Sequence, residues 1–221
     1  LIQENDRIAV CISGGKDSMI LAKLMQQLKM VTDVPFELEF MVMDPGYNKE
    51  NRQKIEDNAK LLNIPIKIFE SDIFDVANSV EKSPCYLCAR MRRGFLYAHA
   101  KELGCNKIAL GHHQDDILAT LLMNLTFQGA FATMPPRLYM NKVDVDIMRP
   151  LCLVPEADLV EYAQLRELKK KIKNCPYEQD SFRHDMKEVM ALLEKMNPEA
   201  RHSLWGSMTN IQTEYLPKKI E

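Results

Sequence analysis

The residues best suited to chemistry lie in a short loop, SGGKDS, at positions 13–18. Consecutive glycines can turn successive backbone N–H groups toward one anion. A helix that begins directly afterwards adds free N–H groups and its dipole to the same place. Lys16 supplies a positive charge, and the hydroxyls of Ser13 and Ser18 supply donors. Asp17 fits such a site if it holds a magnesium ion that the phosphates share. The loop therefore indicates a phosphate-binding site.

The commonest phosphate-binding loop is excluded. The Walker A motif would require glycine at position 10, where this chain has Val10, and Ser or Thr at position 17, where it has Asp17. The simpler alternative is a plain turn between a strand and a helix, with Ser13 or Asp17 as the helix cap.

A second candidate site is a cysteine pair. Cys85 and Cys88 are separated by two residues in PCYLC and could chelate one metal ion or two corners of an iron–sulfur cluster. Cys175 stands alone in KNCPYEQDS and is the best candidate for a third ligand. A zinc site, a cluster and a pair without a ligand all remain open from the spacing alone. The other three cysteines lie in apolar surroundings and are expected in the core: Cys11, Cys105 and Cys152.

Alternating apolar and amphipathic runs are expected to position these residues. The expected strands are 7–12, 37–43, 65–70 and 107–113, and the expected helices are 17–29, 48–63, 86–103 and 115–127. This order predicts an α/β fold with a Rossmann-like parallel sheet and helices on both faces. Ligands of such sheets bind beyond the carboxyl ends of the strands. The turns at 13–18, 44–47 and 111–116 should therefore gather along one edge.

From residue 134 onward the pattern predicts a hairpin or crossover leading to a last strand, followed by helices at 155–165, 181–196 and 198–212. We expect one domain, 1–221, with a core at about 6–153 and a helical C-terminal part at about 154–221. No stretch of 18 or more apolar residues appears, and the first residues lack a secretion signal, so we expect a cytoplasmic protein without a membrane span.

The formal net charge of −2 argues against nucleic-acid binding through a broadly basic surface. Any RNA contact would need local patches. We hypothesise two, Arg90 to Arg93 and Arg166 to Lys173, with solvated helix faces as the alternative for each.

The motifs taken together resemble a known family. SGGKDS in its strand–loop–helix context resembles the PP-loop of the N-type ATP pyrophosphatases. The loop is followed by PCxxC with RMRRG, then ALGHHQDD, MPPRL and IMRPL. That order resembles the tRNA 2-thiocytidine synthetase family from Asp6 to about Ile211.

The resemblance implies an activity. ATP would adenylate the C2 oxygen of a cytidine in the tRNA anticodon loop, and sulfide would displace AMP. Three cysteines of the family bind a 4Fe-4S cluster with one iron left free to carry sulfide. Cys85 and Cys88 match the family's pair directly. A second cysteine often lies near the family's third ligand, whereas this chain offers only Cys175 there.

The resemblance and the predicted sheet edge also imply the site residues and the cofactors ATP, Mg²⁺ and a 4Fe-4S cluster. The catalytic candidates are Lys16, Asp17, Arg92, Asp115 and Asp116. The nucleotide-binding candidates are Ser13, Gly14, Gly15, Lys16, Asp17, Ser18, Met43, Asp44 and Gly111. The cluster ligands would be Cys85, Cys88 and Cys175. One of Asp115 and Asp116 could hold magnesium or accept a proton, and both could also cap the helix that follows.

The expected partners are a tRNA anticodon loop and a sulfur donor, such as a cysteine desulfurase or free sulfide, and a homodimer is left open. Three other functions are considered. They are a lysidine- or thiouridine-forming tRNA enzyme, a non-catalytic iron–sulfur or zinc module that senses ATP, and an enzyme that transfers sulfur to a small molecule.

Overall fold

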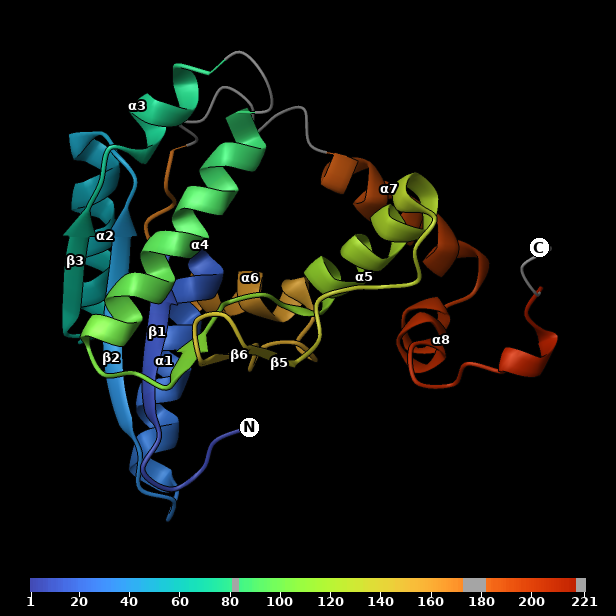
Figure 1. Cartoon of the computed structure of the whole chain (residues 1–221), viewed down its shortest axis with the longest axis horizontal. Coiled ribbons are helices and arrows are strands. Elements are labelled where there is room, and N and C mark those ends of the chain that lie inside the picture. The colour runs from blue at the N-terminus through green and yellow to red at the C-terminus, as the bar shows by residue number, and fades with distance from the viewer. Residues whose placement is uncertain (81–83, 173–181, 218–221) are drawn as a thin grey trace. The chain divides into compact units, whose positions relative to one another are not determined.

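The computed structural model describes residues 1–80, 84–172 and 182–217 (Figure 1). The described strands are β1 (Arg7–Ile12), β2 (Glu37–Asp44), β3 (Ile66–Glu70), β4 (Lys107–Ala109), β5 (Arg137–Met140) and β6 (Val145–Met148). The described α-helices are α1 (Lys16–Val31), α2 (Lys49–Leu61), α3 (Ile73–Asn78), α4 (Pro84–Glu102), α5 (Gln114–Met123), α6 (Glu156–Leu165), α7 (Phe182–Met196) and α8 (Ala200–Ser207). A π-helical turn (Asn124–Gln128) and a 3₁₀ turn (Thr213–Tyr215) are also present.

The strands form one six-stranded sheet in the order β3-β2-β1-β4-β6-β5. All neighbouring strands run parallel except β5, which pairs antiparallel with β6. In the register of the central strand, Val10 lies opposite Phe40 of β2 and Ala109 of β4. The strand order reverses between β1 and β4, so the ligand-binding crevice of this topology is expected beyond those two carboxyl ends. The predicted α/β fold with a mostly parallel sheet is confirmed.

Both faces of the sheet are covered, as the nearly continuous apolar sequence of β1 predicted. Ile8, Val10 and Ile12 point to one face, where they share a core with residues of α1, α2 and α6. Ala9 and Cys11 point to the other face, where they share a core with residues of α4. Figure 1 shows α1 and α4 on opposite sides of β1. Burial of each large aliphatic side chain stabilises the fold by about 1.5–3 kcal/mol.

Some element predictions need correction. The hairpin before the last strand is present as β5 and β6, but the short helix α3 was not predicted. The strand expected at 107–113 ends at Ala109, because the backbone at Gly111 leaves the sheet to pack against the start of α1. The helix expected at 198–212 is confined to Ala200–Ser207, and the N–H of Thr209 instead closes a turn on Gly206.

The chain divides into two compact units. The first comprises 1–114 and 135–179 and holds the sheet with α1–α4 and α6. The second comprises 115–134 and 180–221 and holds α7, α8 and nearly all of α5. The second unit has its own small core, formed by Leu118, Ala119, Leu122, Met186 and Met190. Within the described ranges, no helix is both long and apolar enough to cross a membrane.

Candidate active site

The loop after β1 requires glycine at its centre. Gly14 has φ of +79°, which L side chains rarely adopt. A Cβ on Gly14 would lie 2.5 Å from Cδ1 of Ile55, a fully buried residue of α2. Sterics and backbone angle thus both fix Gly14, and the buried side of this loop is sealed by α2.

The first turn of α1 has no side-chain cap. Gly15 is the N-cap, and the first helical bond runs from the N–H of Met19 to the Gly15 carbonyl at 3.2 Å. Among the described residues, no protein acceptor is recorded for the backbone N–H groups at 14–18. A helix start of this kind attracts anions, because its N–H groups and dipole point the same way.

The Ser18 hydroxyl sets the shape of this loop. It accepts a hydrogen bond from the Ser13 N–H at 3.1 Å and donates one to the Gly15 carbonyl at 2.9 Å. The Ser13 hydroxyl lies 3.3 Å from it. The structure therefore brings the predicted loop residues together on one short segment.

Lys16 is held between two carboxylates. Its ammonium lies 2.8 Å from Asp17 Oδ1 and 3.0 Å from Glu156 Oε1 at the start of α6. Burial alone would lower the pKa of Lys16, but the two carboxylates outweigh it and the pKa is raised. Lys16 therefore stays charged. Glu156 was missed by sequence reasoning, because nothing local in the sequence links it to a loop 140 residues earlier.

Gly111 lies where the segment after β4 meets the start of α1. A Cβ at this position would be 3.0 Å from both the Cα and the backbone nitrogen of Ser18. Glycine thus permits the two backbones to approach closely at the switch point between β1 and β4. The expected contact of Gly111 with the nucleotide stays a prediction, and packing against Ser18 is a sufficient reason for glycine here.

Two further residues reach the loop that sequence reasoning did not assign to it. The Tyr47 hydroxyl donates to the Ser13 carbonyl at 2.9 Å. Lys171 donates to the same carbonyl at 3.2 Å, and its ammonium also lies 3.2 Å from the Tyr47 hydroxyl oxygen. The only sequence signal for Tyr47 was its place in the turn after the second strand. The sequence pattern puts Lys171 in the basic patch at 166–173.

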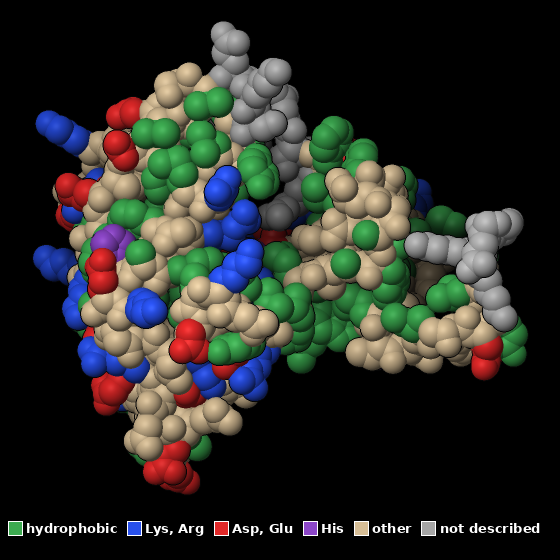
Figure 2. Space-filling model, in the orientation of Figure 1, with side chains coloured by type: hydrophobic (Ala, Val, Ile, Leu, Met, Phe, Trp, Pro, Cys, Tyr) green, Lys and Arg blue, Asp and Glu red, His purple; other side chains and the backbone are tan. Residues whose placement is uncertain are grey.

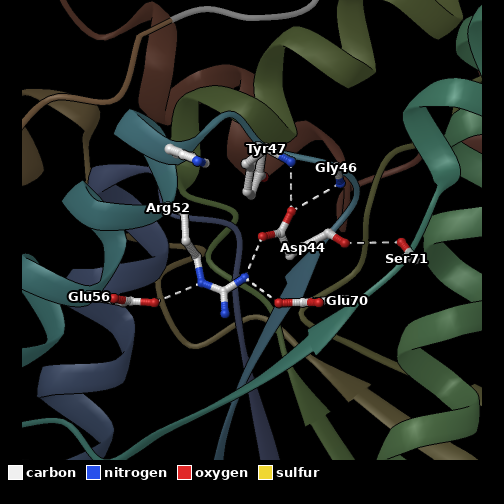
Figure 3. A pocket seen from close by; sticks show the side chains of 8 residues that line it. Asp44, Gly46, Tyr47, Arg52, Glu56, Glu70 and Ser71 are labelled. Carbon is white, nitrogen blue, oxygen red and sulfur yellow. Dashed lines mark hydrogen bonds and ion pairs between the residues drawn. The ribbon is translucent and has the colours of Figure 1, made fainter.

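Asp44 closes the turn after β2. One carboxylate oxygen accepts from the backbone N–H groups of Gly46 and Tyr47, at 3.0 and 2.7 Å, and the other lies 2.7 Å from the Arg52 guanidinium (Figure 3). Met43 and Asp44 are both buried. Their expected contact with the nucleotide stays a prediction, and the turn and Arg52 together already use both oxygens of Asp44.

A pocket of about 480 Å³ opens beside this turn (Figure 3). It is lined by Asp44, Gly46, Tyr47, Lys49, Arg52, Glu56, Glu70 and Ser71. Arg52 pairs with all three carboxylates of this lining, those of Asp44, Glu56 and Glu70. The walls are therefore polar and already bonded to one another.

Asp115 and Asp116 lie in the first turn of α5 and are the first two residues of the second unit. Within that unit, Asp115 Oδ1 lies 2.8 Å from a guanidinium nitrogen of Arg201, which also bonds Glu194 at 2.9 Å. The backbone carbonyl of Asp116 accepts from the Thr120 hydroxyl. The roles of both aspartates in magnesium binding or proton transfer stay predictions.

The cysteine pair occupies the first turns of α4. Cys85 is exposed and Cys88 is half-buried, three residues apart on the helix. The opposite end of α4 lies at the amino edge of the sheet, since the nearby Asn106 N–H bonds the carbonyl of Arg7 at the start of β1. A helical rise of about 1.5 Å per residue puts Cys88 about 22 Å from Leu103 along the axis, and β1 is about 20 Å long. Figure 1 shows the start of α4, which carries the pair, at the end of the sheet where β2 finishes.

The pair fits two corners of a metal site but does not complete one. In the parts of the chain that the structure describes, no group of three or more His, Cys, Asp or Glu side chains is placed to hold a metal ion. Cys175 lies outside the described residues, so the predicted third ligand stays a prediction. The other cysteines are buried: Cys11, Cys105 and Cys152. Burial raises the pKa of each of these thiols, to about 11 for Cys105.

The two basic patches differ in structure. Arg90 and Arg93 are exposed and Arg92 is half-buried on α4, just beyond Cys88. Figure 2 shows Lys and Arg side chains beside this helix, in small groups interspersed with other residue types. The patch at 166–173 is described only to residue 172, and part of it is tied to α2 and to the loop after β1.

Comparison with known proteins places this geometry in a family. A model of the PP-loop domain matches residues 2–190. The tRNA-cytidine(32) 2-sulfurtransferase of Geobacter sulfurreducens is 35% identical over 221 residues, covering 98% of this chain and 86% of that protein. Its counterpart from Neisseria meningitidis serogroup C is 42% identical over 173 residues, covering 76% of this chain and 53% of that protein. The chain thus spans about half the length of the Neisseria relatives it matches.

A solved structure shows the same fold. The U34-tRNA thiolase NcsA from Methanococcus maripaludis, solved with its [4Fe-4S] cluster, superimposes with a TM-score of 0.74 at 24% identity. The likeness covers 99% of this chain and 75% of the thiolase chain. The open loop after β1, the strand order and these relatives agree: the chain belongs to the PP-loop domain family and, within it, to the family of tRNA-cytidine(32) 2-sulfurtransferases.

Proposed function

We propose that the chain is an ATP-dependent tRNA sulfurtransferase that activates the C2 oxygen of a cytidine and replaces that oxygen with sulfur. The observation that carries this proposal is the uncapped, glycine-lined start of α1 at the switch point of the sheet. The name of the relatives supports cytidine 32 of tRNA as the acceptor.

In the first step, AMP is transferred to the acceptor. The C2 oxygen attacks the α-phosphorus of ATP, the bond from that phosphorus to the bridging oxygen breaks, and pyrophosphate leaves with the electron pair. Lys16 and the backbone N–H groups at 14–18 stabilise the charge that develops on the phosphates. We assign Asp17 to the magnesium ion that the phosphates share.

In the second step, sulfur replaces the activated oxygen. A 4Fe-4S cluster held by Cys85, Cys88 and Cys175 would supply bound sulfide, as the cluster of the solved thiolase fold supports. The C2–S bond forms, the C2–O bond breaks, and AMP leaves. Asp115 or Asp116 would accept a proton or hold magnesium, and Arg92 would place positive charge near the reacting groups.

The partners follow from this chemistry. Arg90, Arg92 and Arg93 would contact the phosphates of a tRNA anticodon loop. A cysteine desulfurase or free sulfide would restore the sulfur. The proposal also includes the assembly of two copies of this chain as a homodimer. Three cysteines committed to a cluster need a reducing compartment, which favours the cytoplasm.

The test is an anaerobic assay with cluster-loaded protein, ATP, magnesium, sulfide and tRNA that lacks 2-thiocytidine. We expect 2-thiocytidine in the digested tRNA, with one AMP and one pyrophosphate formed per thiolation. Cys88→Ser should lose the visible absorbance of the cluster and the thiolation together, whereas Cys105→Ser should keep both, because Cys105 is buried in the core.

Three results would contradict the proposal. ADP and phosphate as products would exclude the adenylation step. Stoichiometric zinc in strictly anaerobic protein would exclude the cluster. A protein that carries the cluster but binds no tRNA at low salt, where phosphate contacts are strongest, would instead favour sulfur transfer to a small molecule.

A further inference from the structure

A basic segment lies along helix α2 and is held there by two buried asparagines. We call residues 169–172 the strap. Asn58 bonds both backbone groups of Lys169, accepting from its N–H at 2.8 Å and donating to its carbonyl at 2.9 Å. Asn51 does the same to Ile172, at 2.8 Å for each bond. Both asparagines are almost fully buried, and a buried amide left without its partners is costly, so the path of the strap is fixed.

The strap brings one lysine to the PP-loop. The Lys171 ammonium lies 3.2 Å from the Ser13 carbonyl oxygen and 4.3 Å from the centroid of the Tyr47 ring. Its Cδ is 3.6 Å from the place a Cβ would occupy on Gly14. The side chain thus lies against the same loop that leaves its N–H groups open.

The two lysines that lie at this loop differ in whether carboxylates contact their ammonium groups. Lys16 has carboxylate partners on two sides, Asp17 and Glu156. The recorded partners of the Lys171 ammonium are a carbonyl, a hydroxyl and an aromatic ring, and none of them is a carboxylate of the described residues. Among the described residues, Lys171 is therefore the lysine at this loop whose ammonium contacts no carboxylate.

We propose that Lys171 is a second phosphate-binding lysine of the PP-loop, which binds the pyrophosphate end of ATP. This inference rests on the proposed function for the identity of the nucleotide. When the α-phosphorus–oxygen bond breaks, negative charge grows on the departing pyrophosphate, and a nearby ammonium stabilises it. Within the basic patch at 166–173, Lys171 therefore binds the nucleotide and does not contact RNA.

The experiment compares variants of two lysines on the same strap. Lys171→Met keeps an apolar stem beside Gly14 and removes the ammonium, with its charge and its contacts to Ser13 and Tyr47. Lys169→Met is the matched control, because its ammonium pairs with Asp57 at 2.6 Å and its backbone carries the bond to Asn58. Calorimetry on the cluster-loaded protein measures binding of Mg-ATP, magnesium pyrophosphate and adenosine, and a gel-shift assay measures binding of tRNA.

We expect Lys171→Met to weaken Mg-ATP and pyrophosphate binding by about ten- to a hundredfold, the usual worth of a hydrogen bond to a charged group. The affinities for adenosine and for tRNA should stay within about twofold of the wild-type values, because under this proposal neither ligand bonds the Lys171 ammonium. Lys171→Arg should recover most of the lost affinity for Mg-ATP and pyrophosphate. Lys169→Met should lose no affinity for either ligand.

Other outcomes overturn the inference. Wild-type affinity for Mg-ATP in Lys171→Met would remove Lys171 from the phosphate site and leave the proposed function intact. An equal loss of adenosine affinity would make its role structural. A loss of tRNA affinity alone would make it an RNA contact. If the wild-type protein itself bound no Mg-ATP, the proposed function would fail first.

Discussion

Helices α1 and α2 follow neighbouring parallel strands, and their first residues have almost the same backbone conformation. The N-cap of α1, Gly15, has φ −77° and ψ 159°, and that of α2, Asn48, has φ −66° and ψ 160°. Asn48 accepts from the N–H of Asn51 with its own side chain at 2.8 Å, whereas Gly15 has no side chain to offer. The start of α2 is therefore closed by a side chain of the protein, whereas the start of α1 is open, because it has no side-chain cap.

The turns before these helices differ in the same way. Before α2, the Asp44 carboxylate accepts from the N–H groups of Gly46 and Tyr47, so the turn satisfies its own donors. Before α1, the Ser18 hydroxyl accepts a hydrogen bond from only one backbone N–H group of the turn, that of Ser13. The backbone conformation alone therefore does not mark an anion site. The residue type at the N-cap, and where the donors of the turn go, distinguish the two.

The largest expected effect is at the open start. Lys16→Ala should lower the rate of AMP and pyrophosphate formation at least about a hundredfold, because it removes a charge that stabilises the transferring phosphates. The fold should remain, since an ion pair whose side chains are still about a quarter exposed contributes about 1 kcal/mol or less. Product analysis by chromatography and thermal unfolding measure the two effects.

The control for this variant lies on the same helix. Lys29 pairs with Glu37 at 3.0 Å at the other end of α1, so Lys29→Ala should leave turnover unchanged. Undiminished AMP formation by Lys16→Ala would show that the open start is not where the phosphates are activated.

A smaller effect should follow from closing the open start. A Cβ on Gly15 would meet nothing closer than the Ser13 hydroxyl at 3.7 Å, so Gly15→Asp fits and can cap α1. Its carboxylate would occupy the N–H groups and repel the phosphates. We expect Mg-ATP affinity to fall at least about tenfold, while thermal stability stays the same or rises by a few tenths of a kcal/mol.

Two companion variants sharpen this result. Gly15→Asn caps the helix without a charge and should weaken Mg-ATP less than Gly15→Asp does. Asn48→Asp places a carboxylate at the N-cap of α2, the closed start, and should leave Mg-ATP affinity unaltered. Calorimetry that found Gly15→Asp equal to the wild type would remove the backbone N–H groups of this turn from the binding site.

Much of this arrangement could be predicted from the sequence because its signals are local. The strands and main helices show their period within a few residues, and SGGKDS is one contiguous string between a strand and a helix. The short helix α3 was missed, since six residues carry little periodicity. The partners of the loop were missed for a different reason. Glu156 and Lys171 reach it only through the packing of α6 and the strap, more than 130 residues away along the chain.

The smallest expected effect is at the closed start, and it tests whether the two helix starts are independent. Asn48→Ala removes the side-chain acceptor for the Asn51 N–H and should lower the free energy of unfolding by about 1 kcal/mol. Mg-ATP affinity should stay within about twofold, because the donors of α2 are bonded within the protein and are not needed by the ligand. Denaturant titration and calorimetry on the same preparation give both numbers. Asn48→Ser, which keeps an acceptor, should recover most of the lost stability. A tenfold loss of Mg-ATP affinity without any loss of stability would mean that the start of α2 also binds the nucleotide, and the distinction between an open and a closed helix start would then be wrong.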